Sequence, residues 1–381
     1  MKNKKIYTFL MLFLLFIFCI STKSHASNNE PSITSGSAIL LENSTSKVLF
    51  EKNINEKLEP ASITKIMTAI LAIENCNLDD VVTVPYEAIS NIPSGYSVAP
   101  LQTDEQITVD QLLRVLMVHS ANDAANALAY HIDGSIPAFA ERMNAKLNAL
   151  GLKDSHFTNP SGQHDTNHYS TAHDIAILLQ YCMKNTTFKT YASLKSCQLS
   201  ATNKSEERSF QNTNPMLQPN SSYYYKPLVT TKTGFTSQAM FCLASFASYN
   251  NLDLICVILH CDTSDIRFNE TKNLFNYGFQ NFAFKDIASK GDTVTEISVH
   301  NATEETKSLK LVLADSISTL INTSDDIEIS VEGSDCLALS SGTWTANNDI
   351  VMVNGKTISS SDISYSYFKS DGNSAGTSIP L

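Results

Sequence analysis

The stretch Pro60-Ala61-Ser62-Ile63-Thr64-Lys65-Ile66-Met67-Thr68-Ala69 combines a helical pattern with two reactive side chains. Apolar residues recur at helical spacing between Ile66 and Ile73, which predicts a helix that starts close to Pro60. Ser62 and Lys65 lie at positions i and i+3, so in a helix they share one face and come within reach of each other. An amine placed there can take the hydroxyl proton. The stretch therefore predicts a serine nucleophile with a lysine base.

The Ser-x-x-Lys pattern is a weak indicator by itself, because residues 44–47 and residues 366–369 also match it. The first of these falls in a predicted hairpin turn. The second falls in a polar segment with no predicted helix after it. Only the match at Ser62 opens a predicted helix, so the helical context selects it.

A second motif, Ser120-Ala121-Asn122, falls between two predicted helices. Thr108 and Gln111 form a capping box that predicts the start of the first helix, which ends near His119. Helical spacing resumes over residues 123–132. The motif therefore lies on a short loop, where it offers a hydroxyl and an amide to a substrate or to a proton relay.

A third motif, Lys232-Thr233-Gly234, occurs once and directly precedes a predicted strand over residues 239–248. On an edge strand it can pair with an extended peptide, because glycine allows close backbone approach and lysine adds a positive charge. Any one of the three motifs is more typical of a capped turn or a solvated lysine. The three together, in this order and context, indicate one catalytic site.

Two predicted hairpins enclose these motifs. The first covers residues 33–52, and the second joins residues 239–248 to residues 252–261. Residues 270–282 have the spacing of a closing helix, and residues 196–226 have the polar composition of a surface connection. This mixture predicts an α/β domain of the α+β kind over residues 27–288.

After residue 288 the sequence changes to short alternating runs, such as residues 296–299 and 326–331. Alternation with a period of two residues indicates strands. We therefore expect a small all-β domain over residues 289–369 and a polar tail over residues 370–381. The tail has neither the apolar face nor the basic flanks of an amphipathic membrane anchor.

The first residues of the chain predict the cellular location of the protein. Three lysines precede an uncharged apolar run from Ile6 to Thr22, and the small-residue site Ser24-His25-Ala26 follows. This pattern predicts a signal peptide over residues 1–26 and hence a secreted, extracytoplasmic protein at the cell wall or the outer face of the membrane. The alternative is an uncleaved N-terminal anchor, because the run is close to the length that spans a bilayer.

Charge and cysteine content exclude several classes of protein. The 381 residues include 27 Lys and Arg against 38 Asp and Glu, a formal charge of -11, so nucleic acid is not an expected partner. Seven cysteines follow residue 26 without a Cys-x-x-Cys pair, which matches neither a disulfide framework nor a zinc ribbon. A single disulfide remains open at this point.

A histidine-rich segment raises the question of a metal. His164 and His168 have the His-x-x-x-His spacing that binds zinc on a helix, and His156 and His173 lie nearby. The sequence Asn159-Pro160-Ser161-Gly162 predicts a loop instead. We therefore expect no metal and no other cofactor, and we expect surface or supporting polar roles for these histidines.

Taken together, these residues resemble the serine D-Ala-D-Ala carboxypeptidases among the low-molecular-mass penicillin-binding proteins. The resemblance covers residues 33–285 and extends to Asn212-Thr213-Asn214 and His168-Tyr169-Ser170-Thr171-Ala172. It implies a penicillin-recognising serine transpeptidase and β-lactamase-like fold. In that fold an antiparallel sheet packs against a helical subdomain, the site lies between them, and a small all-β domain follows.

The resemblance also implies the site residues. Ser62 corresponds to the acylating nucleophile, Lys65 to its general base, and Ser120 to a further catalytic side chain. The positions that correspond to substrate-binding residues are Asn122, Lys232, Thr233, Gly234, Phe235 and Arg267. The backbone N–H groups of Ser62 and Phe235 are the candidate oxyanion donors. The expected substrates are peptidoglycan pentapeptide stems, and β-lactam antibiotics are the expected covalent inhibitors.

Two departures and two alternatives accompany this interpretation. Thr230 stands where the family has a glycine, and Gln163 stands where a leucine usually follows the Asn-Pro-x-Gly sequence. A β-lactamase is the first alternative, although the Glu-x-x-Leu-Asn pattern of its class A members is missing after Ser120. A non-catalytic muropeptide-binding protein is the second, although such a protein has no use for Ser62 together with Lys65.

Overall fold

The computed structural model describes residues 30–298, 308–312, 316–324, 327–333, 351–353, 356–358, 363–369 and 379–380. The described residues fall into two compact units, which divide between Phe284 and Lys285. The signal peptide expected at residues 1–26 lies outside the described residues, as does the expected tail apart from residues 379–380. No helix in the described part of the chain is long and apolar enough to cross a membrane.

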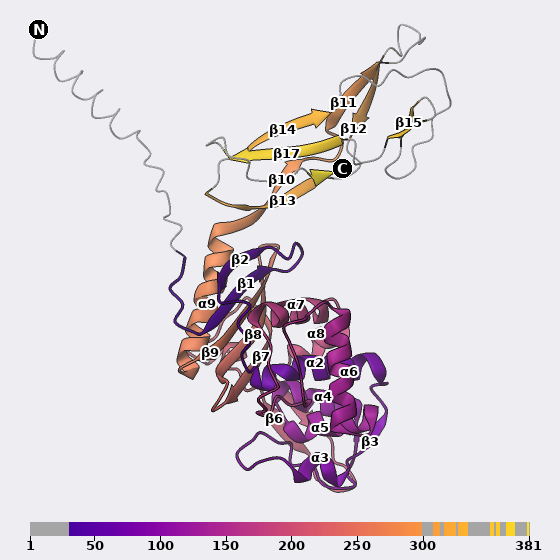
Figure 1. Cartoon of the computed structure of the whole chain (residues 1–381), viewed down its shortest axis with the longest axis vertical. Coiled ribbons are helices and arrows are strands. Elements are labelled where there is room, and N and C mark those ends of the chain that lie inside the picture. Colours follow the sequence, from indigo (N-terminus) through magenta and orange to yellow (C-terminus); the bar gives the residue numbers. More distant parts are fainter. Residues whose placement is uncertain are drawn as a thin grey trace, which may run out of the picture. The chain divides into compact units, whose positions relative to one another are not determined.

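The first unit is built around a five-stranded antiparallel sheet with the order β2-β1-β9-β8-β7 (Figure 1). Its strands are β1 (Ser37–Glu42), β2 (Val48–Lys52), β7 (Leu228–Thr236), β8 (Met240–Tyr249) and β9 (Leu252–Cys261). Both predicted hairpins are therefore confirmed. Asn250 and Asn251 join β8 to β9 with φ of 50° and 61°, the left-handed pair that a tight hairpin turn requires.

Helices cover both faces of this sheet, as Figure 1 shows. The long helix α9 (Ser264–Asn281) packs on one face, where Gly278 lies directly against Leu40 and Leu254. The neighbouring strand residues Ile39 and Ile255 belong to the core that lies under the helices on the other face. Because strand side chains alternate between faces, these central strands are apolar on both.

The helical region on the other face contains most of the core. The α2 helix (Lys65–Asn75) is buried over its first eight residues, which accounts for its apolar sequence. Six further helices belong to this region: α3 (Tyr86–Ser90), α4 (Val109–Val118), α5 (Asn122–Asp133), α6 (Ile136–Ala149), α7 (Ala172–Cys182) and α8 (Thr186–Ala192). The Thr108 side chain accepts a hydrogen bond from the Gln111 amide at the start of α4, which confirms the predicted helix start.

Two expectations about this unit need correction. Helix α9 begins at Ser264 rather than near residue 270, because the Thr263 side chain caps it and its charged first turns are partly buried. Residues 196–226 are not only a surface connection, since β5 (Ser196–Leu199) pairs with β6 (Arg208–Gln211). The period-two burial of Cys197 and Leu199 is the strand signal that polar composition concealed.

The second unit contains the strands expected after residue 288. Among its described segments, β11 (Thr293–Ser298) pairs with β12 (Ser308–Val312), and β14 (Ile327–Gly333) pairs with β17 (Ile363–Lys369). Further pairs join β10 (Phe282–Ala288) to β13 (Ile317–Asn322), β15 (Val351–Val353) to β16 (Lys356–Ile358) and β17 to β18 (Ile379–Pro380). The described segments of this unit are thus extended.

One short strand pairing and six cysteines complete this description. Strand β3 (Val81–Thr83) pairs with β4 (Gln106–Thr108) beside the helices. The cysteines between residues 76 and 261 are all free thiols, and most are buried as small apolar side chains.

Candidate active site

Ser62 and Lys65 lie where a short 3-10 helix, η1 (Ala61–Thr64), passes into α2. The Lys65 side chain is fully buried, although it carries an amine. Its Nζ lies 2.9 Å from Ser62 Oγ, 2.9 Å from Asn122 Oδ1 and 2.6 Å from the carbonyl oxygen of Ser161. The structure therefore brings the predicted hydroxyl and amine into direct contact.

Ser120 and Asn122 reach the same place from the junction of α4 and α5. Ser120 has a φ of 63°, a left-handed conformation that is uncommon for serine and typical of constrained functional positions. The Asn122 amide group donates to the carbonyl oxygen of Ser97, which fixes its carbonyl oxygen toward Lys65. Asn122 therefore presents an acceptor, and not a donor, to the lysine.

Strand β7 supplies the opposite wall. Lys232 is buried, and its Nζ donates to Ser120 Oγ at 2.9 Å. A side chain on Gly234 would lie 2.7 Å from the Pro60 carbonyl oxygen and 3.2 Å from the Ser62 nitrogen. The strand can approach the start of η1 this closely only because residue 234 is glycine.

These residues line one cleft of about 350 Å³. Its wall includes most of the expected site residues, namely Ser62, Ser120, Asn122, Thr233, Gly234, Phe235 and Arg267. The Phe235 side chain is 54% exposed, an unusual position for a large apolar side chain. Lys65 and Lys232 lie behind this wall and reach it through the two serines that they contact.

Arg267 lies on α9 and is almost entirely buried. Its Nη1 donates to the carbonyl oxygens of Gly234 and Cys242, and its Nη2 donates to Ser264 Oγ. Its Nε is buried without a partner. The guanidinium thus links β7 to β8, and its Nε–H remains available as a hydrogen-bond donor beside the cleft.

The burial of three basic side chains, Lys65, Lys232 and Arg267, determines the electrostatics of the site. Burial, followed by the positive charge of Lys232, holds the pKa of Lys65 well below its ordinary value. Burial, followed by the charge of Arg267, lowers the pKa of Lys232 to about 7. Burial also lowers the pKa of Arg267, to about 10. The site therefore favours the neutral form of the Lys65 amine more than water does.

The sequence predicts a loop at residues 159–162, but it does not reveal that this loop supplies the third partner of Lys65. We call residues 158–168 the Ser161 loop. Its Ser161 carbonyl oxygen contacts Lys65, and its Pro160 carbonyl oxygen accepts from Thr68 Oγ1 at 2.6 Å. A backbone carbonyl leaves no trace in residue type. The only available signal is the Asn-Pro-Ser-Gly turn, which predicts a loop and no function.

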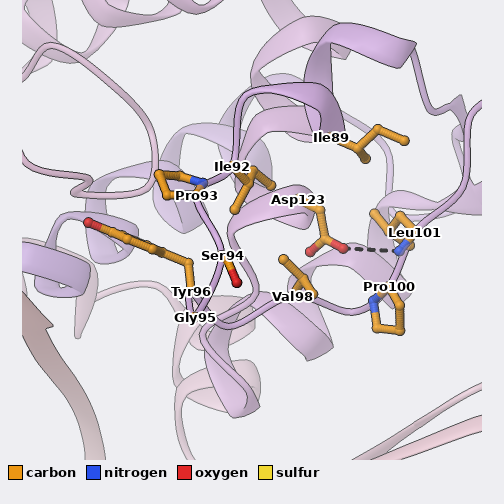
Figure 2. A pocket seen from close by; sticks show the side chains of 10 residues that line it. All are labelled: Ile89, Ile92, Pro93, Ser94, Gly95, Tyr96, Val98, Pro100, Leu101 and Asp123. Atoms are coloured by element: carbon orange, nitrogen blue, oxygen red, sulfur yellow. Dashed lines mark hydrogen bonds between the residues drawn. The ribbon is translucent and has the colours of Figure 1, made fainter.

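A second segment, residues 91–101, forms the outer wall of the cleft, and we call it the Ser94 loop. Ser94, Gly95 and Tyr96 line the cleft on one side and a separate pocket of about 300 Å³ on the other. Figure 2 shows the residues that line this second pocket, among them Asp123, whose carboxylate accepts a hydrogen bond from the Leu101 amide. Asp123 accepts hydrogen bonds from the amides of Ala99 and Leu101.

An antiparallel sheet, a helical region and a lysine-paired serine in one cleft define the class of penicillin-recognising serine enzymes, and the expected fold class is confirmed by solved structures. Penicillin binding protein 5 from Haemophilus influenzae is 26% identical and has a TM-score of 0.69, with 92% of this chain and 95% of that chain covered. DacD from Francisella tularensis, at 22% identity, shares the fold with a TM-score of 0.70.

The chain belongs to the D-alanyl-D-alanine carboxypeptidase family, whose sequence pattern matches residues 24–263. It is 31% identical over 296 residues to the D-alanyl-D-alanine carboxypeptidase DacF of Bacillus subtilis, covering 76% of this chain and 73% of the relative. It is 32% identical to DacA of Haemophilus influenzae, covering 71% and 68%. The recognised family and the serine peptidase class are thus confirmed.

Proposed function

We propose that this enzyme removes the terminal D-alanine from peptidoglycan pentapeptide stems through an acyl-enzyme on Ser62. The family establishes a serine carboxypeptidase that acts on peptidoglycan. The observation that carries the residue assignment is the set of partners around Lys65 Nζ. Two of the three, Asn122 Oδ1 and the Ser161 carbonyl oxygen, can only accept hydrogen bonds.

A neutral amine has two N–H donors and one lone pair. When both donors are directed at the two fixed oxygens, the lone pair is left facing the third partner, Ser62 Oγ. Ser62 then donates its proton to Lys65 as it attacks a carbonyl carbon, so Lys65 acts as the general base. The lowered pKa of Lys65 makes this neutral form available.

The remaining residues stabilise and orient the substrate. The backbone N–H groups of Ser62 and Phe235 are the donors for the oxyanion, and the close approach of Gly234 to Ser62 sets their separation. Ser120 gives its hydroxyl proton to the departing D-alanine amine and takes a proton in return from Lys232, whose Nζ donates a hydrogen bond to it. Arg267 and Thr233 attract the carboxylate of the terminal D-alanine, and water then hydrolyses the acyl-enzyme.

The same site accounts for acylation by penicillin. A β-lactam has a strained amide beside a carboxylate, so it presents the groups of the peptide substrate to Ser62 and Arg267. The resulting ester occupies the position of the acyl-enzyme. We infer that β-lactam antibiotics are covalent inhibitors of this chain and that no metal takes part.

The domain organisation follows the same proposal. Residues 1–26 are the signal peptide that takes the chain outside the cytoplasm, where peptidoglycan lies. Residues 27–288 form the catalytic domain and residues 289–369 the β-rich domain, with a polar tail over residues 370–381. The family match over residues 24–263 supports the position of the catalytic domain.

Labelling with fluorescent penicillin, followed by peptide mapping, tests the nucleophile. We expect one adduct on Ser62 and release of D-alanine from a pentapeptide, and we expect Ser62→Ala to lose both. An adduct on another residue would contradict the assignment of Ser62 as the nucleophile. Label without D-alanine release would indicate a binding protein, and rapid loss of the label would indicate a β-lactamase.

The pH dependence of acylation tests the base. Lys232 lowers the pKa of Lys65, so Lys232→Met raises that pKa and moves the acidic limb of the acylation rate to higher pH. Lys232→Arg keeps the charge and serves as the matched control, with the limb close to its wild-type position. A limb that stays in place in Lys232→Met would show that Lys65 is not the titrating base.

A further inference from the structure

His168, the last residue of the Ser161 loop, is a buried histidine that contacts both the first residue of that loop and the Ser-x-x-Lys motif. Its side chain is 2% exposed, and its Nε2 lies 2.8 Å from Thr64 Oγ1. Its Nδ1 lies 3.1 Å from the backbone nitrogen of Thr158. The ring also stacks on Phe157, with the ring centroids 5.0 Å apart. One imidazole therefore joins two segments that are remote in sequence.

The contacts determine the tautomer. The backbone N–H of Thr158 can only donate, so Nδ1 of His168 accepts and carries the lone pair. In a neutral imidazole the other nitrogen then carries the proton, and Nε2 donates to Thr64 Oγ1. Burial lowers the pKa of His168 to about 3, which agrees with a neutral ring.

The Ser161 loop is held against η1 by further contacts. The side-chain oxygen Oδ1 of Asn159 accepts hydrogen bonds from the backbone amides of Ser161, Gly162 and Gln163. Gly162 has a φ of 77°, and a side chain there would lie 1.9 Å from the Ala61 carbonyl oxygen. The loop thus approaches the residue before Ser62 without any intervening side chain.

We propose that His168 is a positioning residue, which links Thr64 to the Ser161 loop and thereby places the Ser161 carbonyl oxygen as the acceptor that orients the Lys65 amine. Thr64 directly precedes Lys65, and Thr158 begins the segment that ends at the Ser161 carbonyl. A hydrogen bond at each ring nitrogen fixes the distance between these two backbones. The Lys65 to Ser161 contact of 2.6 Å depends on that distance.

This inference rests on the proposed roles of Ser62 and Lys65, and it goes beyond them. Misorientation of the amine slows proton transfer in the acylation step. It leaves the noncovalent affinity for a β-lactam unchanged, because His168 and Thr64 lie outside the cleft lining. A displacement of about 1 Å in a reacting group costs on the order of a hundredfold in rate. The acylation rate constant is therefore the sensitive quantity.

Stopped-flow acylation with a chromogenic cephalosporin separates the acylation rate constant from the dissociation constant. Thr64→Val removes only the hydroxyl that accepts from His168, with little change of volume. His168→Asn keeps an acceptor near Thr158 and loses the donor to Thr64. We expect each to lower the rate constant by about tenfold to a hundredfold, with an unchanged dissociation constant.

The double variant provides the decisive comparison. His168→Asn and Thr64→Val break the same hydrogen bond, so the double variant should acylate no more slowly than either single variant. His168→Gln keeps a donor near Thr64 and loses the Thr158 contact, so its effect should add to that of Thr64→Val. Additive loss in the first pair would overturn the proposal.

Two controls separate positioning from general destabilisation. Thr230→Val removes another buried hydroxyl, which donates to the Ala192 carbonyl oxygen, and His164→Asn changes an exposed histidine of the same loop. Both should acylate at the wild-type rate. A wild-type rate in folded Thr64→Val, whatever its melting temperature, would refute the positioning role. Failure of the proposed function would instead appear as a wild-type enzyme without a Ser62 adduct.

Discussion

The Ser161 loop and the Ser94 loop border the same cleft, but they are held in opposite ways. The Ser161 loop lies on η1 with no room for a side chain at Gly162, and its His168 is buried. The Ser94 loop exposes Ser94 and Gly95, and a pocket lies beneath it (Figure 2). The side that orients the Lys65 amine is thus closely packed, whereas the side that faces the substrate is more open.

The anchors of the two loops differ accordingly. Asn159 and His168 hold the Ser161 loop from within, through backbone amides along its length. The Ser94 loop is attached near one end, where Asn122 and Asp123 on α5 bind the backbone of Ser97 and Ala99. Tight anchoring suits proton transfer, which tolerates little displacement. Partial anchoring suits the entry of a peptide strand.

A matched pair of glycine substitutions gives the largest expected effect. Gly162→Ala places a Cβ 1.9 Å from the Ala61 carbonyl oxygen at a φ of 77°, so the loop must leave η1. We expect unfolding to become easier by about 3 kcal/mol and acylation to fall by more than about a hundredfold. Thermal unfolding and penicillin labelling measure these effects.

The control lies on the other loop. Gly95 also has a positive φ, of 89°, but a Cβ there meets nothing within 4 Å. Gly95→Ala should therefore cost only about 1 kcal/mol for the left-handed conformation and leave acylation within severalfold of wild type. Equal effects in the two variants would remove the distinction between a packed loop and an open loop.

The side-chain part of the site could be predicted from sequence, and the backbone part could not. Ser62, Ser120 and Lys232 stand in recognisable motifs, because the chemistry needs those residue types, and the structure brings them to one cleft. The Ser161 oxygen belongs to the backbone. The partners Thr64 and His168 are separated by 104 positions, so no local pattern joins them. Strand and helix periodicity predicted both hairpins, but missed β5 and β6 in a polar segment.

The pH dependence of the unfolding free energy gives an effect of intermediate size. His168 of the Ser161 loop and Asp123, which anchors the Ser94 loop, should change it with opposite signs. The pKa of His168 is about 3 in the folded chain, so protons bind the unfolded chain first and stability falls from about pH 6.5 to about pH 3. His168→Asn should flatten this part of the curve of unfolding free energy against pH. A slope that is unchanged in His168→Asn would assign the acid sensitivity to other groups.

Asp123 has the opposite effect on stability as the pH falls. Burial raises its pKa, against the opposing effect of the backbone amides of Leu101 and Ala99, so the folded chain binds a proton before the unfolded chain does. Stability gained from this group increases as the pH falls through its raised folded-state pKa toward its ordinary value of 3.8. Asp123→Asn should therefore steepen the acid loss that His168→Asn flattens. Curves that move in the same direction would contradict these signs.

The smallest expected effect concerns substrate affinity through the Ser94 loop. Asp123→Asn replaces one accepting oxygen by a donor that faces the amides of Ala99 and Leu101, so the wall of the cleft loosens. We expect KM for a pentapeptide to rise about threefold to tenfold with kcat nearly unchanged, because Asn122 still holds its oxygen toward Lys65.

The same variant also changes the pH dependence of acylation. The negative charge of Asp123 raises the pKa of Lys65, so Asp123→Asn should lower that pKa and move the acidic limb of the acylation rate to lower pH, opposite to Lys232→Met. Asp79→Asn, which changes an exposed carboxylate, is the control and should leave both KM and the acidic limb unchanged. If Asp123→Asn instead lowered kcat alone, the Ser94 loop would serve the chemical step, as the Ser161 loop does.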